Sequence, residues 1–335
     1  MSHRSASLFA SLLVALALTG CPSDPATDAG LGTDAPAGDD APSGEDAPVA
    51  LDAGSDAPAA TDAGAPTGCT GTARPDVSGV RGTEGLIVAR DGTIYYSQRA
   101  AVGRLTPTGG PENAWVSLPS GASTVWGIAL DAANETLYVG SPATGTIYSV
   151  DLRLDTPVAT VFVAGAGAPN GLTVGPDGAL YYSDFSGGRV MRVEATGGSP
   201  TQVTTSGVRG ANGVAFDGDG TLLVCSYQTG TLFRLTLSAG VESARATVAT
   251  SLGAPDGVAV DANGDLWVTD NSAGRVLRVN AATGASEVIA SGISAAASLD
   301  FGAGELGCSD VYVASSGAAR RLEDVGVEGA DVLWH

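Results

Sequence analysis

Residues 255–284 read PDGVAVDANGDLWVTDNSAGRVLRVNAATG, and this pattern specifies the architecture of most of the chain. An apolar run, VAV, is followed by Asn263-Gly264, a pair that favours a tight hairpin turn. Apolar and polar residues then alternate in DLWVTD and again in GRVLRVN, as they do in half-buried strands. A further segment of this kind, SEVIAS, precedes the next copy of the pattern. The pattern therefore predicts four short antiparallel strands.

The same pattern occurs six times from residue 83 onward, and a second clear copy, PNGLTVGPDGALYYSDFSGGRVMRVEATGG, starts at Pro169. The small residue that leads each copy recurs every 41 to 44 residues, as Gly85, Gly127, Gly171, Gly213, Gly257 and Ser298. A period in this range, with four antiparallel strands per repeat, is typical of a β-propeller. We therefore predict an all-β fold over residues 69–335, a six-bladed β-propeller with four antiparallel strands per blade.

The sixth copy, from Ala297, is degenerate and has no clear fourth strand. Two segments are candidates to complete it, DVLWH at 331–335 and RPDVSGV at 74–80. Either would close the ring by joining one end of the folded region to the last blade.

The first twenty residues are different in character. A short basic start precedes an apolar run from Leu8 to Leu18 that is too short to be a membrane-spanning helix. The run ends in Leu18-Thr19-Gly20-Cys21, which resembles the lipobox of bacterial lipoproteins. The resemblance implies that residues 1–20 are a signal peptide and that the thiol of Cys21 carries lipid. It also implies a place on the bacterial cell envelope, and Pro22 after the cysteine favours the outer membrane, on its periplasmic or surface face.

Residues 22–68 consist almost entirely of Asp, Ala, Pro, Gly, Ser and Thr, with ten acidic residues and no basic one. Such a segment has too few large apolar groups to offset chain entropy, so it should stay disordered. Its like charges and prolines should keep it extended. We therefore expect residues 21–68 to be a disordered tether between the lipidated Cys21 and the propeller.

The formal net charge of −20 limits the choice of partners. About half of this charge lies in the tether, and the rest of the chain is still acidic, with no basic stripe. Nucleic acid is therefore not an expected partner. Acidity also disfavours adsorption to anionic lipid, so membrane contact is expected through the lipid anchor only. We expect a monomer.

The remaining cysteines and the histidines narrow the chemistry further. Cys69 and Cys308 lie near the two ends of the folded region and are expected to pair in an oxidising compartment. Cys225, in the strand-like TLLVCSY, is expected to be a buried small hydrophobe. His3 lies in the predicted signal and His335 is the last residue, which leaves no histidine for a Ser-His-Asp triad.

One residue per copy should face the central axis of the propeller. The first strand of a blade is innermost, so the residues before the leading small residues should converge at one mouth of the channel. These residues are Glu84, Trp126, Asn170, Asn212, Asp256 and Ala297. Two carboxylates and two amide oxygens suit a divalent cation, with Ca²⁺ favoured over Mg²⁺ or Mn²⁺. The alternative is that the Asn-Gly and Asp-Gly pairs only shape turns, which fits Glu84 poorly.

These motifs resemble the gluconolactonase/regucalcin (senescence marker protein) family of six-bladed propellers, over residues 83 to about 330. Glu84-Gly85, Asn212-Gly213 and Asp256-Gly257 match motifs of that family in the same blade order. The resemblance implies that Glu84, Asn212 and Asp256 are metal ligands. It also implies that Asn170 contacts the substrate and that Asp256 acts as a general base. The implied function is a divalent-metal-dependent hydrolase acting on a lactone or ester, with a small-molecule or sugar-derived ligand.

The sequence departs from the family pattern near the substrate position. Gly171 stands where the family often has Asp, and Ala168 and Pro169 stand where some members have a sugar-binding arginine. The metal assignment is therefore better supported than the substrate assignment.

Two other functions remain open. One is a non-catalytic propeller like those of NHL repeats, binding a ligand or a protein partner, and the other is a relative of strictosidine synthase with another reaction. Loops after the second strands would supply possible pocket walls or simply lie in solvent; they contain Gln98, Asp184, Phe185, Tyr227, Asp270 and Asn271.

Overall fold

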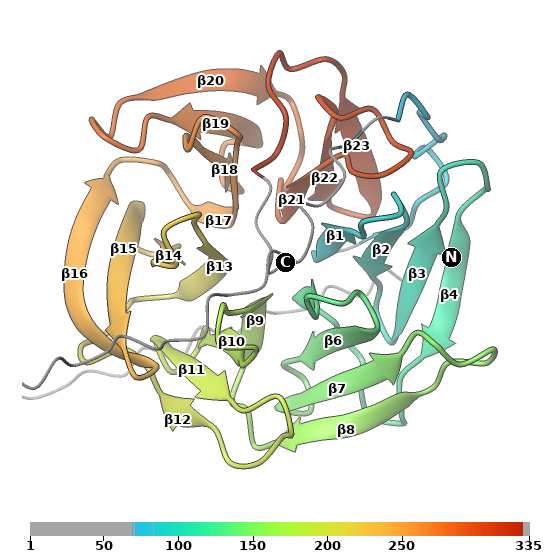
Figure 1. The fold of residues 1–335 in the computed structure, drawn as a ribbon, viewed down its shortest axis with the longest axis horizontal. Helices are drawn as coiled ribbons and strands as arrows, with labels where there is room; N and C mark the ends of the chain where they lie inside the picture. The colour runs from blue at the N-terminus through green and yellow to red at the C-terminus, as the bar shows by residue number, and fades with distance from the viewer. Residues whose placement is uncertain (1–68, 70, 83, 331–335) are drawn as a thin grey trace, which may run out of the picture. The chain divides into compact units, whose positions relative to one another are not determined.

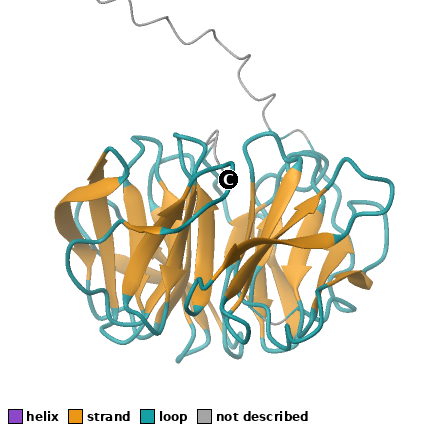
Figure 2. Ribbon diagram, turned by 90° about the horizontal axis from the view of Figure 1, so that it is seen from below, coloured by secondary structure: helices purple, strands orange, loops and turns teal. Residues whose placement is uncertain are grey.

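The computed structural model describes residues 69, 71–82 and 84–330, which form six antiparallel sheets around a central axis (Figure 1). Five sheets have four strands each, and the sixth has three. The strands run between two faces on which the loops gather (Figure 2). The described residues offer no helix with the length and apolarity needed to cross a membrane. The predicted all-β, six-bladed propeller is confirmed, whereas the predicted signal peptide, Cys21, the tether and residues 331–335 lie outside the described residues.

Each blade is built from strands that follow one another in the sequence. Blades one to three contain β1 (Leu86–Val88), β2 (Ile94–Ser97), β3 (Ala101–Leu105), β4 (Glu112–Ser117); β5 (Ile128–Leu130), β6 (Thr136–Ser141), β7 (Thr146–Asp151), β8 (Ala159–Ala164); and β9 (Pro169–Val174), β10 (Leu180–Asp184), β11 (Arg189–Val193), β12 (Thr201–Gln202). Blades four to six contain β13 (Ala211–Phe216), β14 (Leu222–Ser226), β15 (Thr231–Ser238), β16 (Val241–Ala249); β17 (Pro255–Val260), β18 (Leu266–Asp270), β19 (Arg275–Val279), β20 (Ser286–Ser291); and β21 (Leu299–Phe301), β22 (Val311–Ser315), β23 (Ala318–Leu322).

The core lies between neighbouring blades. Six clusters of buried apolar side chains occur among the described residues, one at each of the six contacts between blades. The second strand of each blade supplies much of this core. Strands β14 and β18, for example, are buried at every position. Burial of both faces removes these strands from water, and this burial is the main force that holds the blades together.

The leading glycines allow the inner strands to approach one another at one mouth of the channel. A Cβ atom on Gly127 would overlap the carbonyl of Asn170 in the next blade, and one on Gly213 would overlap the carbonyl of Asp256. In the sixth blade Ser298 takes this place. Its hydroxyl donates to the carbonyl of Leu86 at 2.7 Å, and its N–H donates to the carbonyl of Glu84 at 3.1 Å. The repeated glycine is therefore a requirement of close packing between blades.

The structure tests one of the two alternatives for completing the sixth blade, residues 74–80. These residues form no strand, so they do not supply a fourth strand for the last blade. Val77 and Val80 join the apolar cluster between the sixth and first blades. The other alternative, residues 331–335, lies outside the described residues.

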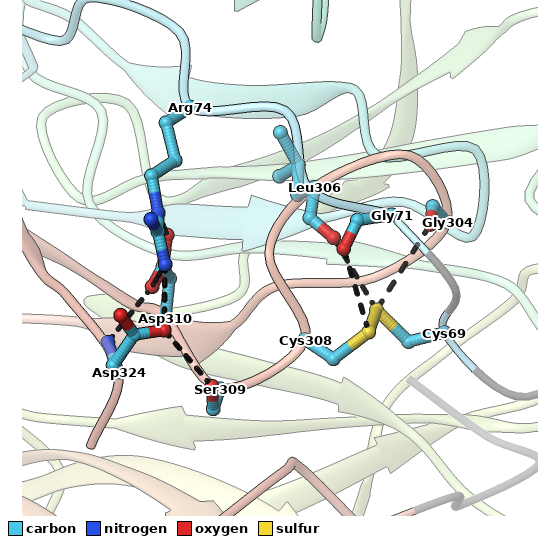
Figure 3. The surroundings of a disulfide bond; sticks show 9 residues. All are labelled: Cys69, Gly71, Arg74, Gly304, Leu306, Cys308, Ser309, Asp310 and Asp324. Atoms are coloured by element: carbon cyan, nitrogen blue, oxygen red, sulfur yellow. Dashed lines mark hydrogen bonds and ion pairs between the residues drawn. A yellow bond between two sulfur atoms is a disulfide. The ribbon is translucent and has the colours of Figure 1, made fainter. Parts of the chain in front are cut away.

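A disulfide and an ion pair hold the start of the folded region to the last blade (Figure 3). Cys69 and Cys308 form the pair expected from the sequence, with their Cα atoms 5.4 Å apart. Beside it, Arg74 Nε lies 2.9 Å from the fully buried carboxylate of Asp310. Cys225 is a buried free cysteine, as predicted.

Candidate functional site

The inner strands of the six blades surround a central cavity of about 690 Å³. Five of the six residues predicted to meet at one mouth line this cavity: Glu84, Trp126, Asn170, Asn212 and Asp256. Ala297, the sixth, is buried, and its neighbour Ser298 lines the cavity. The structure therefore brings together side chains that are up to 172 residues apart in the sequence, from Glu84 to Asp256.

Local irregularities in the inner strands set the direction of these side chains. The pairing of β9 with β10, β13 with β14 and β17 with β18 shifts register at Asn170-Gly171, Asn212-Gly213 and Asp256-Gly257 respectively. A β-bulge of this kind re-aims the side chain at which it occurs. In blade five the Gly257 N–H donates to the Thr269 hydroxyl at 2.8 Å, and in blade three Gly171 donates to Ser183 at 2.8 Å. A hydroxyl on the second strand thus satisfies the amide freed by the bulge.

Glu84 and Asp256 form an interacting pair of carboxyl groups at this mouth. Asp256 is only 4% exposed, and Glu84 is half-buried. Burial raises the pKa of Glu84 to about 7. Burial and the nearby charge of Glu84 raise the pKa of Asp256 well above its usual range. Among the described residues, neither group forms an ion pair with a basic side chain. A nearby cation would therefore favour the ionised forms of both carboxyl groups.

Two amides support Asp256. The side chains of Asn212 and Asn271 hydrogen-bond to its carboxylate, which favours the charged form and partly opposes the effect of burial. Asn271 in turn accepts a hydrogen bond from the Tyr227 hydroxyl at 3.2 Å. An amide that donates through its nitrogen keeps its oxygen available for another partner. Asn212 can thus support Asp256 and still present an oxygen ligand.

Phe185, Tyr227 and Asn271 occupy equivalent positions in blades three, four and five. Each follows a second strand, and each donates its backbone N–H to the carbonyl two residues before the inner residue, at 3.0 Å. The acceptors of these bonds are Ala168, Gly210 and Ala254. These loops lie over the mouth of the channel, as the sequence allows.

Three other loop residues named as possible pocket walls have structural roles instead. Asp184 pairs with Arg189, and Asp270 pairs with Arg275, while both carboxylates accept backbone N–H groups of their own hairpins. Gln98 donates to Asn113 at 2.8 Å, next to the outer strand of blade one. Their sequence positions suggest the mouth, but stronger local partners hold these side chains elsewhere.

The link from Tyr227 through Asn271 to Asp256 is the feature that the sequence does not reveal. Tyr227 and Asn271 are 44 residues apart, so no local motif joins them. The signal that could have found them is positional: they occupy the same place in consecutive blades. Neighbouring loops at the same mouth lie within reach of one another.

The residues at the mouth fit a divalent cation by their chemistry. Two carboxylates and nearby amide oxygens make a hard-oxygen donor set. No group of three or more His, Cys, Asp or Glu side chains in the described part of the chain could hold a metal. Any site here would therefore depend on the amides as well as on the carboxylates. The assignment of Glu84, Asn212 and Asp256 as ligands stays a prediction.

Comparison with known families supports the resemblance drawn from the motifs. Residues 186–317 match the family model described as the SMP-30/Gluconolactonase/LRE-like region. This segment includes Asn212 and Asp256, while Glu84 and Asn170 lie before it. No curated protein sequence matches the chain significantly.

Solved structures share the fold at low sequence identity. A gluconolactonase from Xanthomonas campestris is 17% identical over 77% of this chain and 88% of its own, with a TM-score of 0.59. A luciferin-regenerating enzyme is 16% identical over 76% and 97% of the two chains, with a TM-score of 0.62. A virginiamycin B lyase from Staphylococcus aureus is 16% identical over 77% and 88%, with a TM-score of 0.57. At these identities the likeness establishes the fold alone.

Proposed function

We propose that the protein is a divalent-cation-dependent hydrolase of the gluconolactonase-like class, acting on a lactone or ester. The observation that carries this proposal is the Glu84–Asp256 pair, two partly or fully buried carboxyl groups at the channel mouth that pair with no basic side chain of residues 71–82 and 84–330. Such a pair is costly to keep charged unless a cation lies between or beside the two groups. The family match over residues 186–317 supports a hydrolytic role for this mouth.

Glu84, Asn212 and Asp256 would hold the cation, with Ca²⁺ favoured over Mg²⁺ or Mn²⁺. When bound, the cation would supply Lewis-acid chemistry at the carbonyl of the substrate. Asp256 would take a proton from water, and the hydrogen bonds from Asn212 and Asn271 would favour the charged form that this role needs. Asn170, buried in the adjoining bulge of β9, would orient the substrate.

The same proposal places the protein on the bacterial cell envelope. Lipid on the thiol of Cys21, implied by the Leu18-Thr19-Gly20-Cys21 motif, would anchor it, and Pro22 favours the outer membrane. Several acyl chains on one cysteine would hold the chain stably, as a single chain would not.

The first experiment measures binding of each cation and turnover with the same protein. Calorimetry on the purified full chain should show binding of Ca²⁺, Mg²⁺ or Mn²⁺, and Asp256→Asn should abolish that binding together with the hydrolysis of a panel of lactones. Asp219→Asn is the matched control, because Asp219 is an exposed carboxyl in the turn between β13 and β14.

The outcomes of this experiment separate the candidate functions. Absence of binding of all three cations by the wild type would refute the metal site. Cation binding without turnover of any lactone or ester would instead favour a non-catalytic, cation-stabilised propeller of the NHL type.

A further inference from the structure

Three half-buried aromatic side chains stand in line at the mouth, one from each of blades two, three and four. The ring centroids of Trp126 and Phe185 are 5.9 Å apart with the planes at 72°. Those of Phe185 and Tyr227 are 5.8 Å apart with the planes at 70°. Both pairs have the edge-to-face geometry that stabilises aromatic contacts. We call Trp126, Phe185 and Tyr227 the aromatic arc.

The arc is joined to the predicted reaction centre at both of its ends. Trp126 lines the central cavity together with Glu84 and Asn170. At the other end, the Tyr227 hydroxyl donates to Asn271, whose side chain hydrogen-bonds to Asp256. Burial raises the pKa of Tyr227, and the charges of Asp256 and Glu84 raise it further, as expected for a phenol close to both carboxyl groups. The arc therefore borders the carboxyl pair.

The backbone holds the arc in place. The N–H groups of Phe185 and Tyr227 donate to Ala168 and Gly210 at 3.0 Å, which ties both loops to the inner strands. Each ring also packs against the next, so the arc presents a largely preformed surface. A preformed apolar surface binds an apolar group without a large ordering cost.

Apart from the residues assigned to the cation and to the substrate carbonyl, the arc itself offers few polar groups to a polyhydroxylated ligand. The Tyr227 hydroxyl is already engaged by Asn271. The two residues before Asn170 are Ala168 and Pro169, whose side chains offer no hydrogen-bond donor. A site that binds hydroxyl groups selectively must supply hydrogen-bond partners for them. Aromatic rings instead form favourable contacts with an apolar or aromatic group.

We propose that the aromatic arc sets the substrate class: an uncharged lactone or ester that carries an aromatic or extended apolar group, in preference to a sugar lactone. This inference rests on the proposed hydrolase function. Phe185 is the central specificity-determining residue, because it contacts both of the other rings. The apolar group would lie along the arc, and the carbonyl would face Glu84 and Asp256.

The test compares three lactones on the full chain with Ca²⁺ present: 3,4-dihydrocoumarin, δ-valerolactone and glucono-δ-lactone. We expect kcat/KM for dihydrocoumarin to exceed that for gluconolactone by about two- to tenfold, the range of one aromatic contact. Phe185→Leu should raise KM for dihydrocoumarin by about the same factor, with kcat and the δ-valerolactone parameters little changed. Phe162→Leu is the matched control, because Phe162 is a half-buried phenylalanine that packs on Tyr138 between blades two and three.

Failure of this inference differs from failure of the proposed function. Turnover with gluconolactone preferred, or an equal effect of Phe185→Leu on all three lactones, would overturn the role of the arc and leave the hydrolase standing. If no lactone is hydrolysed, calorimetry with dihydrocoumarin tests whether the arc binds an apolar ligand. Binding that Phe185→Leu weakens and Phe162→Leu does not would support the arc as an apolar ligand site, and absence of binding would overturn it.

Discussion

Glu84 and Asp256 at the mouth are costly to ionise in the folded chain, so the stability of the protein depends on pH. A carboxyl group whose pKa is higher in the folded than in the unfolded chain holds its proton more tightly when folded. The stability that it contributes is present below its ordinary pKa and is lost as the pH rises through the folded value. For Glu84 this loss runs from its ordinary value of 4.5 to about 7, and Asp256 acts in the same direction.

We therefore expect the metal-free protein to melt at a lower temperature at pH 8 than at pH 5. Glu84→Gln should reduce this difference, because glutamine does not ionise and Asp256 loses its charged neighbour, while burial still raises the pKa of Asp256. Thermal unfolding followed by circular dichroism, in a chelating buffer, measures the effect. The control Asp219→Asn should keep the wild-type pH dependence. An unchanged pH dependence in Glu84→Gln would mean that the carboxyl pair is not its source.

At the scale of strands, the glycine that leads each inner strand is a packing requirement. We expect Gly127→Ala to lower the free energy of unfolding by about 1–3 kcal/mol or more, because the new methyl group would overlap the backbone carbonyl of Asn170 and strands move less easily than side chains. Urea unfolding measures this change. Gly110→Ala is the control, since a Cβ there meets nothing within 4 Å and should change stability little. Equal effects of the two substitutions would refute the packing argument.

Sequence reasoning succeeds for the strands because their determinants are local and repeated. The leading glycine, the Asn-Gly or Asp-Gly turn and the alternation after it recur in each blade, so the six copies confirm one another. Contacts between loops of different blades lack such a signal. The bond from Tyr227 to Asn271 depends on how two neighbouring blades pack. For Asp184 and Asp270 the sequence leaves open a pocket wall or a solvated loop, and the structure instead pairs each with the arginine five residues later, Arg189 or Arg275.

For the whole molecule, closure of the ring depends on contacts between residues far apart in the sequence. The Cys69–Cys308 disulfide joins positions 239 residues apart, so its loss would free almost the entire propeller in the unfolded state. Loop-closure entropy for a loop of this length sets an upper estimate of roughly 5 kcal/mol. The folded ring has other closing contacts as well, including Arg74–Asp310 and the bonds of Ser298 to the first blade.

We therefore expect the propeller to stay folded without the disulfide but to unfold more easily. The double variant Cys69→Ser, Cys308→Ser should keep the wild-type far-ultraviolet circular dichroism and lose about 2–5 kcal/mol of unfolding free energy in urea. A reductant should shift the wild type toward the variant and leave the variant unchanged. Cys225 reports on the fold independently, because this fully buried thiol should react with an alkylating reagent only after unfolding. Rapid alkylation of Cys225 in the double variant without urea would show that the disulfide, rather than the core between blades, keeps the ring closed.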